Sequence, residues 1–363
     1  MMFRKNIELI ILTGVIIFIS SCGDKFDLNN IEVSDEDVNV GGDTVYVMLN
    51  PVWEGFNKPQ DITIGREPFI YVADTENDRI VMLNLNGQVL STRSIKKPVA
   101  IAQDYMLNLI VCAQFDTIIG GQTQIFSAVY KLNLVSVNHQ LEVAPIKRLL
   151  PRLADLTMPQ REYTGVAAFF DNSFYISRKG PNNSNLVDPD NKVLIFVQKR
   201  LEDGTTIDSL LTDPVALLDP TGTGIMSANQ ISSLTSFYTR SYDMIVTLGG
   251  ENSFKTQWLK FITTPDFTGY QEALYPLASD IMTPNFFENP EGATVDNAGN
   301  IYVSDAAMDS IYKFNSFGDL LTAFGGPGQL SEPHSVAFFD KTLYVADTGN
   351  NRILRFILST EIQ

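Results

Sequence analysis

The sequence predicts an all-β fold, a six-bladed β-propeller of four-stranded antiparallel blades whose ring is closed by an N-terminal strand. Three observations predict it. Segments repeat along the chain, with 42 residues between Asp305 and Asp347. Each repeat holds short strands with alternating apolar positions, separated by Gly, Asn and Asp turns. A single strand pattern at 44–49 precedes the first repeat and has no unit of its own.

Three segments of the chain superimpose on one another. They begin at Pro59, Pro290 and Pro333, and each continues into a Tyr-Val-Ala-Asp or Tyr-Val-Ser-Asp strand and a further strand after an Asn- or Asp-containing turn. Such a unit forms one antiparallel sheet, and a ring of these sheets is a β-propeller.

These units resemble NHL repeats, because the core Tyr-Val-Ala-Asp-Thr-x-Asn-(Asn/Asp)-Arg-Ile is present at 71–80 and 344–353. The resemblance implies the propeller fold. Residues 98–280 match weakly, but they hold three further strand pairs, each followed by a third strand, at 98–102 with 109–113, at 165–170 with 174–177, and at 234–238 with 244–248. Six blades result, and a seventh that uses 214–218 is the minor alternative.

Ring closure supports the count of six. The last unit offers no fourth strand after Leu358, whereas the strand at 44–49 is left over. Since a sheet edge without a partner is prone to unwanted pairing, we expect 44–49 to complete the last blade. The predicted propeller domain therefore spans 44–363.

The composition excludes several function classes. Acidic side chains number 42 against 26 basic ones, and the net charge of −16 argues against nucleic acid as a partner. Two cysteines cannot build a disulfide framework, and two histidines cannot build a three-histidine metal site. Cys112 lies in an apolar run, which predicts a buried and unreactive thiol.

The first residues predict a secretion signal and a lipid attachment site. A basic start, an apolar run from Ile7 to Ile19 and small residues predict a secretory signal peptide at 1–21. Ile19-Ser20-Ser21-Cys22 resembles the lipobox of bacterial lipoproteins, which implies lipidation of Cys22 and attachment to the cell envelope, at the outer membrane. An ordinary secretory signal is the alternative. Residues 22–43 are polar and predict a flexible tether, and the side of the membrane stays open.

The insertions predict which face of the disk binds a ligand. Long connections fall at 114–127, 149–162, 178–192 and 213–230, whereas the other connections stay short. In an up-and-down blade, the connections between the second and third strands, and those between blades, leave the same face. Recognition residues commonly lie on loops that a rigid scaffold positions. We therefore expect ligands on this loop-rich face.

The residue near the start of each innermost strand is expected to line the channel mouth on that face. Alignment of the six units gives this ring as Gln60, Val99, Thr164, Ser232, Glu291 and His334. Glu291 and His334 could serve as acid and base or hold a metal. The alternative is a wet, polar channel lining without a specific role.

A second ring of residues ends the second strand of each unit, and it contains Asp74, Asp305 and Asp347. We expect these carboxylates to accept hydrogen bonds from the turn amides that follow them. Arg178 replaces the Asp in one unit and Lys179 follows it, which suits a carboxylate or polar ligand. A salt bridge to a neighbouring acidic loop is the alternative.

Trp53 lies in a connection on the loop-rich face and is a candidate to stack on a sugar ring. Trp258 alternates with Leu259 in a strand, which predicts packing instead.

Three functions follow. The first is a non-catalytic, lipid-tethered propeller without metal or cofactor, which binds an envelope protein, a peptide, a glycan or another polymer and touches the membrane through its lipid alone. The second is a metal-dependent propeller hydrolase or lactonase that uses Glu291 and His334. The third is a structural subunit with an apolar outer edge. Some NHL-type propellers are amidating lyases with a histidine zinc site, but this sequence lacks that ligand set.

Overall fold

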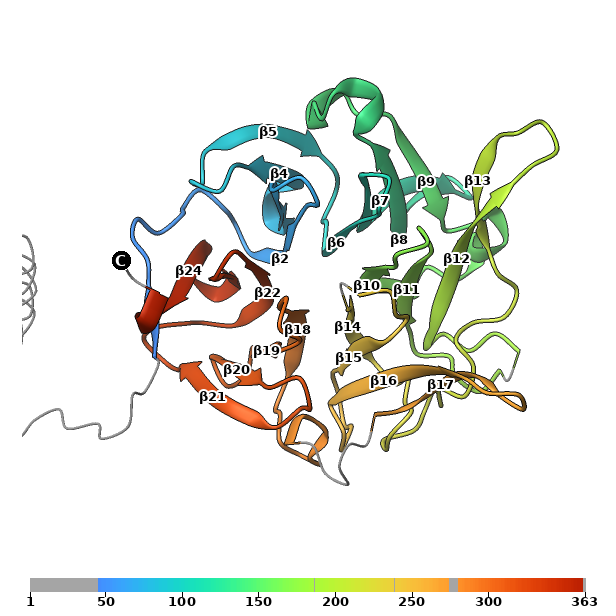
Figure 1. The fold of residues 1–363 in the computed structure, drawn as a ribbon. Helices are drawn as coiled ribbons and strands as arrows, with labels where there is room; N and C mark the ends of the chain where they lie inside the picture. Colours follow the sequence, from blue (N-terminus) through green and yellow to red (C-terminus); the bar gives the residue numbers. More distant parts are fainter. Residues whose placement is uncertain (1–44, 186, 238, 274–279, 362–363) are drawn as a thin grey trace, which may run out of the picture. The chain divides into compact units, whose positions relative to one another are not determined.

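The computed structural model describes residues 45–185, 187–237, 239–273 and 280–361. Within them the chain forms six four-stranded antiparallel sheets arranged around a central axis (Figure 1). The predicted six-bladed β-propeller is therefore confirmed. The predicted signal peptide, Cys22 and the tether at 22–43 lie outside the described residues. In the described part of the chain, no helix is both long and apolar enough to span a membrane.

The blades follow one another along the chain, and the first strand of each lies nearest the channel (Figure 1). The first three blades are β2 (Pro59–Ile64), β3 (Ile70–Asp74), β4 (Arg79–Leu83) and β5 (Val89–Ser94); β6 (Ala100–Gln103), β7 (Asn108–Ile119), β8 (Gln122–Asn133) and β9 (Ile146–Leu150); and β10 (Glu162–Ala168), β11 (Phe174–Lys179), β12 (Lys192–Arg200) and β13 (Thr206–Leu210). The last three are β14 (Ile231–Ser236), β15 (Met244–Leu248), β16 (Thr256–Thr263) and β17 (Thr268–Glu272); β18 (Pro290–Val295), β19 (Ile301–Asp305), β20 (Ser310–Phe314) and β21 (Leu320–Gly325); and β22 (Pro333–Phe339), β23 (Thr342–Asp347) and β24 (Arg352–Leu358) with β1 (Tyr46–Met48).

The helices in the described residues are single 3₁₀ turns in the connections. They are η2 (Thr75–Asn77), η3 (Val135–Val137), η4 (Leu141–Val143), η5 (Leu153–Thr157), η6 (Asp280–Met282), η7 (Thr348–Asn350) and η8 (Ser359–Glu361).

The N-terminal strand closes the ring as predicted. β1 pairs antiparallel with β24, with Tyr46 opposite Leu358. The Tyr46 ring also stacks on Phe324 of the preceding blade, with 4.4 Å between the ring centroids, and its hydroxyl lies 3.0 Å from the Tyr302 hydroxyl. The strand therefore joins the last two blades as well as covering an edge. Residues 214–218, the proposed part of a seventh blade, form no strand and lie between β13 and β14.

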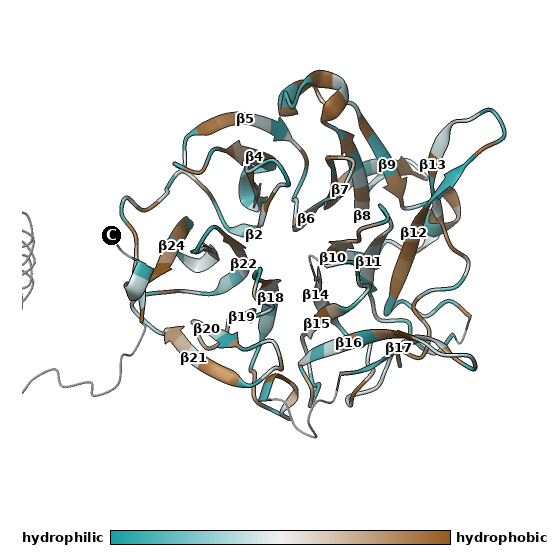
Figure 2. Ribbon diagram, viewed as in Figure 1, coloured by the Kyte–Doolittle hydropathy of each residue, from teal (hydrophilic) through white to brown (hydrophobic). Residues whose placement is uncertain are grey.

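The core lies between neighbouring blades. All five residues of β3, β15 and β19 are buried, because both faces of these strands pack against adjacent sheets. This double burial explains why the second strands read as continuous apolar runs rather than as alternating patterns. Some apolar residues also lie on the outer strands β5 and β21, including the exposed Val89 and Leu321 (Figure 2). They belong to blades 1 and 5, which the last blade separates.

The repeated Asp residues stabilise the loop-rich face. Asp74 and Asp347 each accept a hydrogen bond from the Nε of the arginine five residues later, at 2.6 Å, and from the Nδ2 of the asparagine three residues later. Their backbone partners, however, belong to the loop before the first strand, as in the 2.7 Å bond that the Asn57 amide donates to Asp74. Among the three carboxylates, Asp305 alone accepts the expected hydrogen bonds from the turn amides that follow it, and these bonds are long.

Candidate functional site

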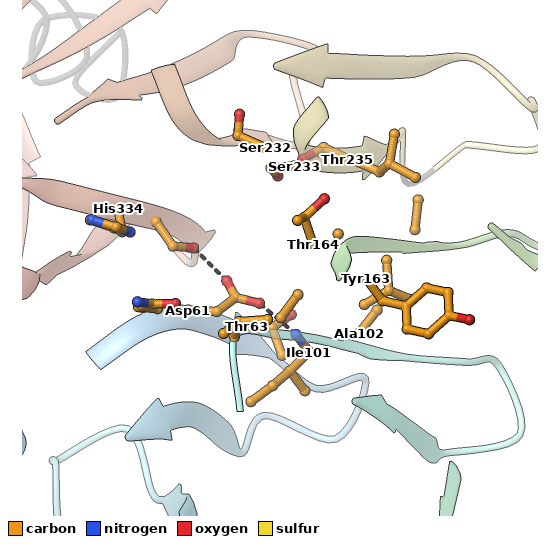
Figure 3. A pocket seen from close by; sticks show the side chains of 18 of the residues that line it. Asp61, Thr63, Ile101, Ala102, Tyr163, Thr164, Ser232, Ser233, Thr235 and His334 are labelled. Atoms are coloured by element: carbon orange, nitrogen blue, oxygen red, sulfur yellow. Dashed lines mark hydrogen bonds between the residues drawn. The ribbon is translucent and has the colours of Figure 1, made fainter. Parts of the chain in front are cut away.

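A cavity of about 550 Å³ occupies the central channel, and residues from the innermost strands of all six blades line it. Figure 3 shows part of its wall, where Asp61, Thr164, Ser232, Thr235 and His334 come from four blades, with Ser232 and Thr235 both in β14. The lining is rich in hydroxyl, amide and charged groups. Such a concave site with convergent polar groups is the usual form of a ligand-binding pocket.

β-Bulges place the side chains at the channel mouth. In five blades the register between the first and second strands shifts across one residue, which is left without a partner in the ladder. These residues are Gln60, Thr164, Ser232, Glu291 and His334. A bulge redirects the side chain that it carries and is common beside binding sites. The ring predicted from the sequence is therefore confirmed as one layer of the cavity wall, and ligand binding by it stays a prediction.

Glu291 and His334 stand on neighbouring blades. The Asn289 amide donates a 2.7 Å hydrogen bond to Glu291 Oε1 and so orients its carboxylate. Burial lowers the pKa of His334, although the negative charges of Glu291 and Glu332 act in the opposite direction. The imidazole is thus largely neutral at pH 7, when it can both donate and accept a hydrogen bond. His334 also lines a second hollow, of about 430 Å³, which lies beside Asp309 and Glu332.

Cations lie on the other side of the mouth. Lys97 and Lys179 line the cavity from the second and third blades. Lys97 is held by Glu76 at 2.7 Å, whereas Lys179 is 3.4 Å from the exposed Glu162. The mouth is therefore bipolar in the sense that the Glu291 carboxylate lies on one side and, on the other, two ammonium groups that each have a carboxylate partner.

Arg178 does not face a ligand. Its side chain is only 4% exposed, and it donates to the Asp188 carboxylate and to the backbone oxygens of Pro189 and Asp190. The prediction of Arg178 as a ligand-binding residue is therefore wrong, and the salt bridge to an acidic loop is what the structure contains. The physical reason is that residues 188–190 of the following loop lie over the guanidinium and satisfy its donors.

The loop around Arg178 belongs to a buried ion network. Arg161, also 4% exposed, pairs with Asp155, Asp188 and Asp190. Burial opposes ionisation of Asp188, but hydrogen bonds from Lys192, Arg178 and Arg161 outweigh it and hold the pKa of this carboxyl well below its ordinary value. The network fixes one wall of the channel mouth, because Arg161 and Lys179 both line the cavity.

Trp53 is packed between the first and last blades and does not face the channel. Its side chain is 6% exposed, and its backbone exchanges two hydrogen bonds with Ile353. Gly87, at a φ of +82°, makes room for the indole, since a Cβ there would lie 2.2 Å from Trp53 Cε2. The prediction that Trp53 stacks on a sugar is therefore wrong, because the ring is enclosed by Gly87, Tyr344 and the Arg355 guanidinium.

Asp61 is a site residue that the sequence reasoning missed. It follows the bulge at Gln60, is half-buried in the cavity wall, and accepts hydrogen bonds from Ser335 Oγ and the Ile101 amide, both at 2.6 Å (Figure 3). Burial raises the pKa of Asp61 to about 6. The signal that could have revealed it is a charged residue at an inward position of an innermost strand.

The cavity offers no aromatic platform among its described lining residues. Tyr163 is the aromatic residue of the wall, but it is 2% exposed and its ring points away from the cavity into the packing between blades (Figure 3). In the part of the chain that the structure describes, no three His, Cys, Asp or Glu side chains are grouped so that they could hold a metal ion.

Comparison with known proteins identifies the repeat. Residues 330–356, which span β22 and most of β24, match the NHL repeat. This is the third of the three units that superimpose in the sequence. No curated protein sequence matches the chain.

Solved structures similar to this chain share its fold. A gluconolactonase from Xanthomonas campestris is 14% identical, with a TM-score of 0.56 over 87% of this chain and 90% of that one. An auxiliary nutrient binding protein from Bacteroides thetaiotaomicron is 11% identical, with a TM-score of 0.55 over 84% and 70%. An aldose sugar dehydrogenase from Streptomyces coelicolor, solved with PQQ, is 12% identical, with a TM-score of 0.53 over 87% and 98%. Since enzymes and a binding protein share the architecture, function has to be argued from the site.

Proposed function

We propose that this chain is a non-catalytic, lipid-tethered propeller of the bacterial cell envelope that binds a peptide, glycan or envelope-protein partner on its loop-rich face. The channel cavity holds the recognised part of the partner. Cys22 carries the lipid, and residues 22–43 tether the propeller to the outer membrane.

One observation carries the binding proposal. Five blades place a polar residue on a bulge at the same level, and all five side chains line one cavity of about 550 Å³. The Thr164 and Ser232 hydroxyls donate to the Ile231 and Pro290 carbonyls of the next blade, which leaves the side chains of Gln60, Glu291 and His334 as the main ones for a ligand. Their amide, carboxylate and imidazole provide donors and acceptors that a polar ligand can match.

The bipolar mouth supports a ligand with hydrogen-bonding groups and separated charges. Glu291 can accept from an amine or hydroxyl, and Lys179 on the opposite side can donate to a carboxylate. Because charge-assisted hydrogen bonds are stronger than neutral ones, these two residues are expected to contribute most to affinity.

A plug in the channel tests the proposal. Gln60 lines the cavity, so Gln60→Trp should fill the mouth while leaving the ladder on either side intact. Labelled wild-type protein is applied to glycan and peptide arrays, and any ligand found should lose its signal with Gln60→Trp. Asp203→Ala, in the exposed turn between β12 and β13, is the control and should bind normally. Equal binding by the plugged variant would remove the basis of the proposal.

A metal-dependent hydrolase or lactonase is the second candidate function. The observation that favours it is a largely neutral imidazole at His334 next to the Glu291 carboxylate in a cavity, which suits proton transfer. Hydrolysis of small lactones and aryl esters by the wild type, with and without added divalent cations, is the test. Activity that His334→Ala abolishes would establish this function in place of simple binding.

A further inference from the structure

The second blade carries a projection that the proposed function does not use. β7 and β8 are 12 residues each and pair in unbroken register from Asn108–Asn133 to Ile119–Gln122. In the other five blades the second strand has five or six residues. β6 pairs with β7 only as far as Cys112, and β9 pairs with β8 only as far as Val129. The rest of the hairpin therefore extends beyond the sheet.

The turn of this hairpin determines which backbone groups are free. Gly120 and Gly121 connect the strands with φ values of +60° and +82°, as a two-residue hairpin turn requires. Ile119 and Gln122 then form a hydrogen-bonded pair, and such pairs alternate along the ladder. The amides and carbonyls of Asp116 and Ile118 consequently point away from β8. The Gln114 amide, which shares this parity, does point outward, since it donates to the Lys96 oxygen at 2.8 Å.

The free edge of β7 lies beside the channel mouth. Within the blade this edge pairs with β6, whose residues 100–103 line the cavity, so its continuation at 115–119 rises above the same wall. Gln114, Ser127 and Ile125 of the hairpin also line the cavity. The hairpin face that carries Ile125 is therefore continuous with the cavity wall.

The base of the hairpin is held firmly, and its tip at 117–124 is uncharged, with Ile118 and Ile119 among Thr and Gln side chains. Phe115 stacks on the buried Phe126 at 5.8 Å, with the Arg148 guanidinium 3.9 Å from the Phe115 ring centroid. Ile118 is 73% exposed and Ile125 is 51% exposed. Lys96 pairs with Asp116 at 2.6 Å at the start of the free edge. Beyond this pair, no Lys or Pro occurs at 117–126, although natural proteins commonly protect exposed edges with such residues.

We propose that the β7 edge at 115–119 binds an extended polypeptide segment as an added strand, and that one end of this segment enters the channel cavity. The inference rests on the proposed function and names its ligand as a peptide. Unpaired backbone amides and carbonyls in strand geometry are complementary to another backbone, and alternate apolar side chains of the added segment would contact Ile118 and Ile125. The lack of an aromatic platform in the cavity fits a peptide better than a stacked sugar ring.

The test begins with a random 12-residue peptide library displayed on phage, selected on the whole propeller. The best peptide is synthesised, and its affinity is measured by fluorescence anisotropy against two variants of one residue. Ile118→Pro removes the outward amide without breaking a bond to β8, whereas Ile118→Thr keeps that amide and the β-branched shape. We expect at least a 10-fold loss with proline and less than a 3-fold loss with threonine. Circular dichroism and thermal melting should be the same for all three proteins.

A change in the peptide provides an independent test from the ligand side. Two versions of the peptide are N-methylated at alternate backbone positions, one at the odd and one at the even positions, with the side chains unchanged. One of these two versions should lose binding. Unchanged affinity of both methylated peptides for the wild type, or of the original peptide for Ile118→Pro, would refute the proposal of an added strand.

Other outcomes separate this inference from the proposed function. Peptides that lose binding with Gln60→Trp but not with Ile118→Pro would leave the channel as the site and refute the edge. Binding to glycan arrays, with no peptide selected from the library, would likewise leave the channel as the site and refute peptide binding at the edge. Dimers in size-exclusion chromatography that Ile118→Pro converts to monomers would show that a second copy of this chain occupies the edge, which also contradicts the proposal.

Discussion

The hydroxyl of Ser335 donates a 2.6 Å hydrogen bond to the Asp61 carboxylate and so links the innermost strands of the last and first blades. The second carboxylate oxygen of Asp61 accepts from the Ile101 amide in the second blade. One half-buried side chain thus connects three blades at the level of the cavity.

This connection predicts an unusual pH dependence of stability. Burial raises the pKa of Asp61 from 3.8 to about 6, so the folded state holds its proton more tightly than the unfolded chain does. Because the carboxyl pKa is raised on folding, the free energy of unfolding falls as the pH rises from about 4 to 6 and then stays constant at higher pH. The shift corresponds to roughly 3 kcal/mol. Asp61→Asn should remove this cost, so its unfolding free energy relative to wild type should rise between pH 4 and pH 7. Denaturant titrations at both pH values measure it, and parallel profiles would contradict the assignment.

Arg178 is predicted to control stability rather than affinity. Arg178→Ala leaves the Pro189 and Asp190 backbone oxygens without this donor, whereas Asp188 keeps Arg161 and Lys192, so the expected cost is about 1–3 kcal/mol. Lys179→Ala, on the neighbouring and more exposed side chain, should change stability by less than about 0.5 kcal/mol. Thermal melting of the two variants compares them directly. If Arg178→Ala melted like the wild type, the ion network would not hold this loop.

The closing strand is predicted to stabilise the whole ring. A chain that begins at Pro51 lacks β1 and the contacts of Tyr46 with Phe324 and Tyr302. We expect a loss of several kcal/mol, roughly the burial of two large side chains and the ladder bonds. A chain that begins at Thr44 is the control. Equal melting temperatures for the two chains would mean that β1 adds little.

Lipidation of Cys22 is predicted to hold the protein at the membrane. Cys22→Ala should leave an unprocessed, unlipidated precursor that no longer partitions into the detergent phase with lipoproteins, and Cys112→Ala should partition normally. The variant with Cys112 replaced is a fair control because this thiol is buried inside the propeller. Detergent partitioning of Cys22→Ala that matched the wild type would end the lipoprotein proposal.

The sequence was sufficient for the blades because each repeat carries its own hydrogen-bonding signature. The Asp74–Asn77–Arg79 cluster is local, so the pattern that reveals it is local too. The weaker middle blades were still found from strand pairs, and the alignment placed Glu291 and His334 correctly at the mouth. The bulges that carry this ring were not predicted, because the sequence does not show the register between the first and second strands.

The failures concern side chains whose partners are distant or belong to irregular loops. Arg178 was read as a ligand contact because its sequence position does not show that the loop returns to cover it. Trp53 was placed on the surface because its neighbour Ile353 lies 300 residues away, in the closing blade. Asp61 was missed because its partners, Ser335 and Ile101, come from two other blades.

The central claim is that the bulge residues of the channel mouth recognise the ligand. Isothermal titration of the best array ligand against Glu291→Gln and His334→Gln, with Asp203→Ala as the opposite-face control, tests it most directly. Losing a charge-assisted contact at Glu291 should cost about 1.5–3 kcal/mol, or roughly 10- to 100-fold in Kd, with no change in melting temperature beyond that of the control. Unchanged affinity in both mouth variants, or a loss confined to Asp203→Ala, would contradict the account.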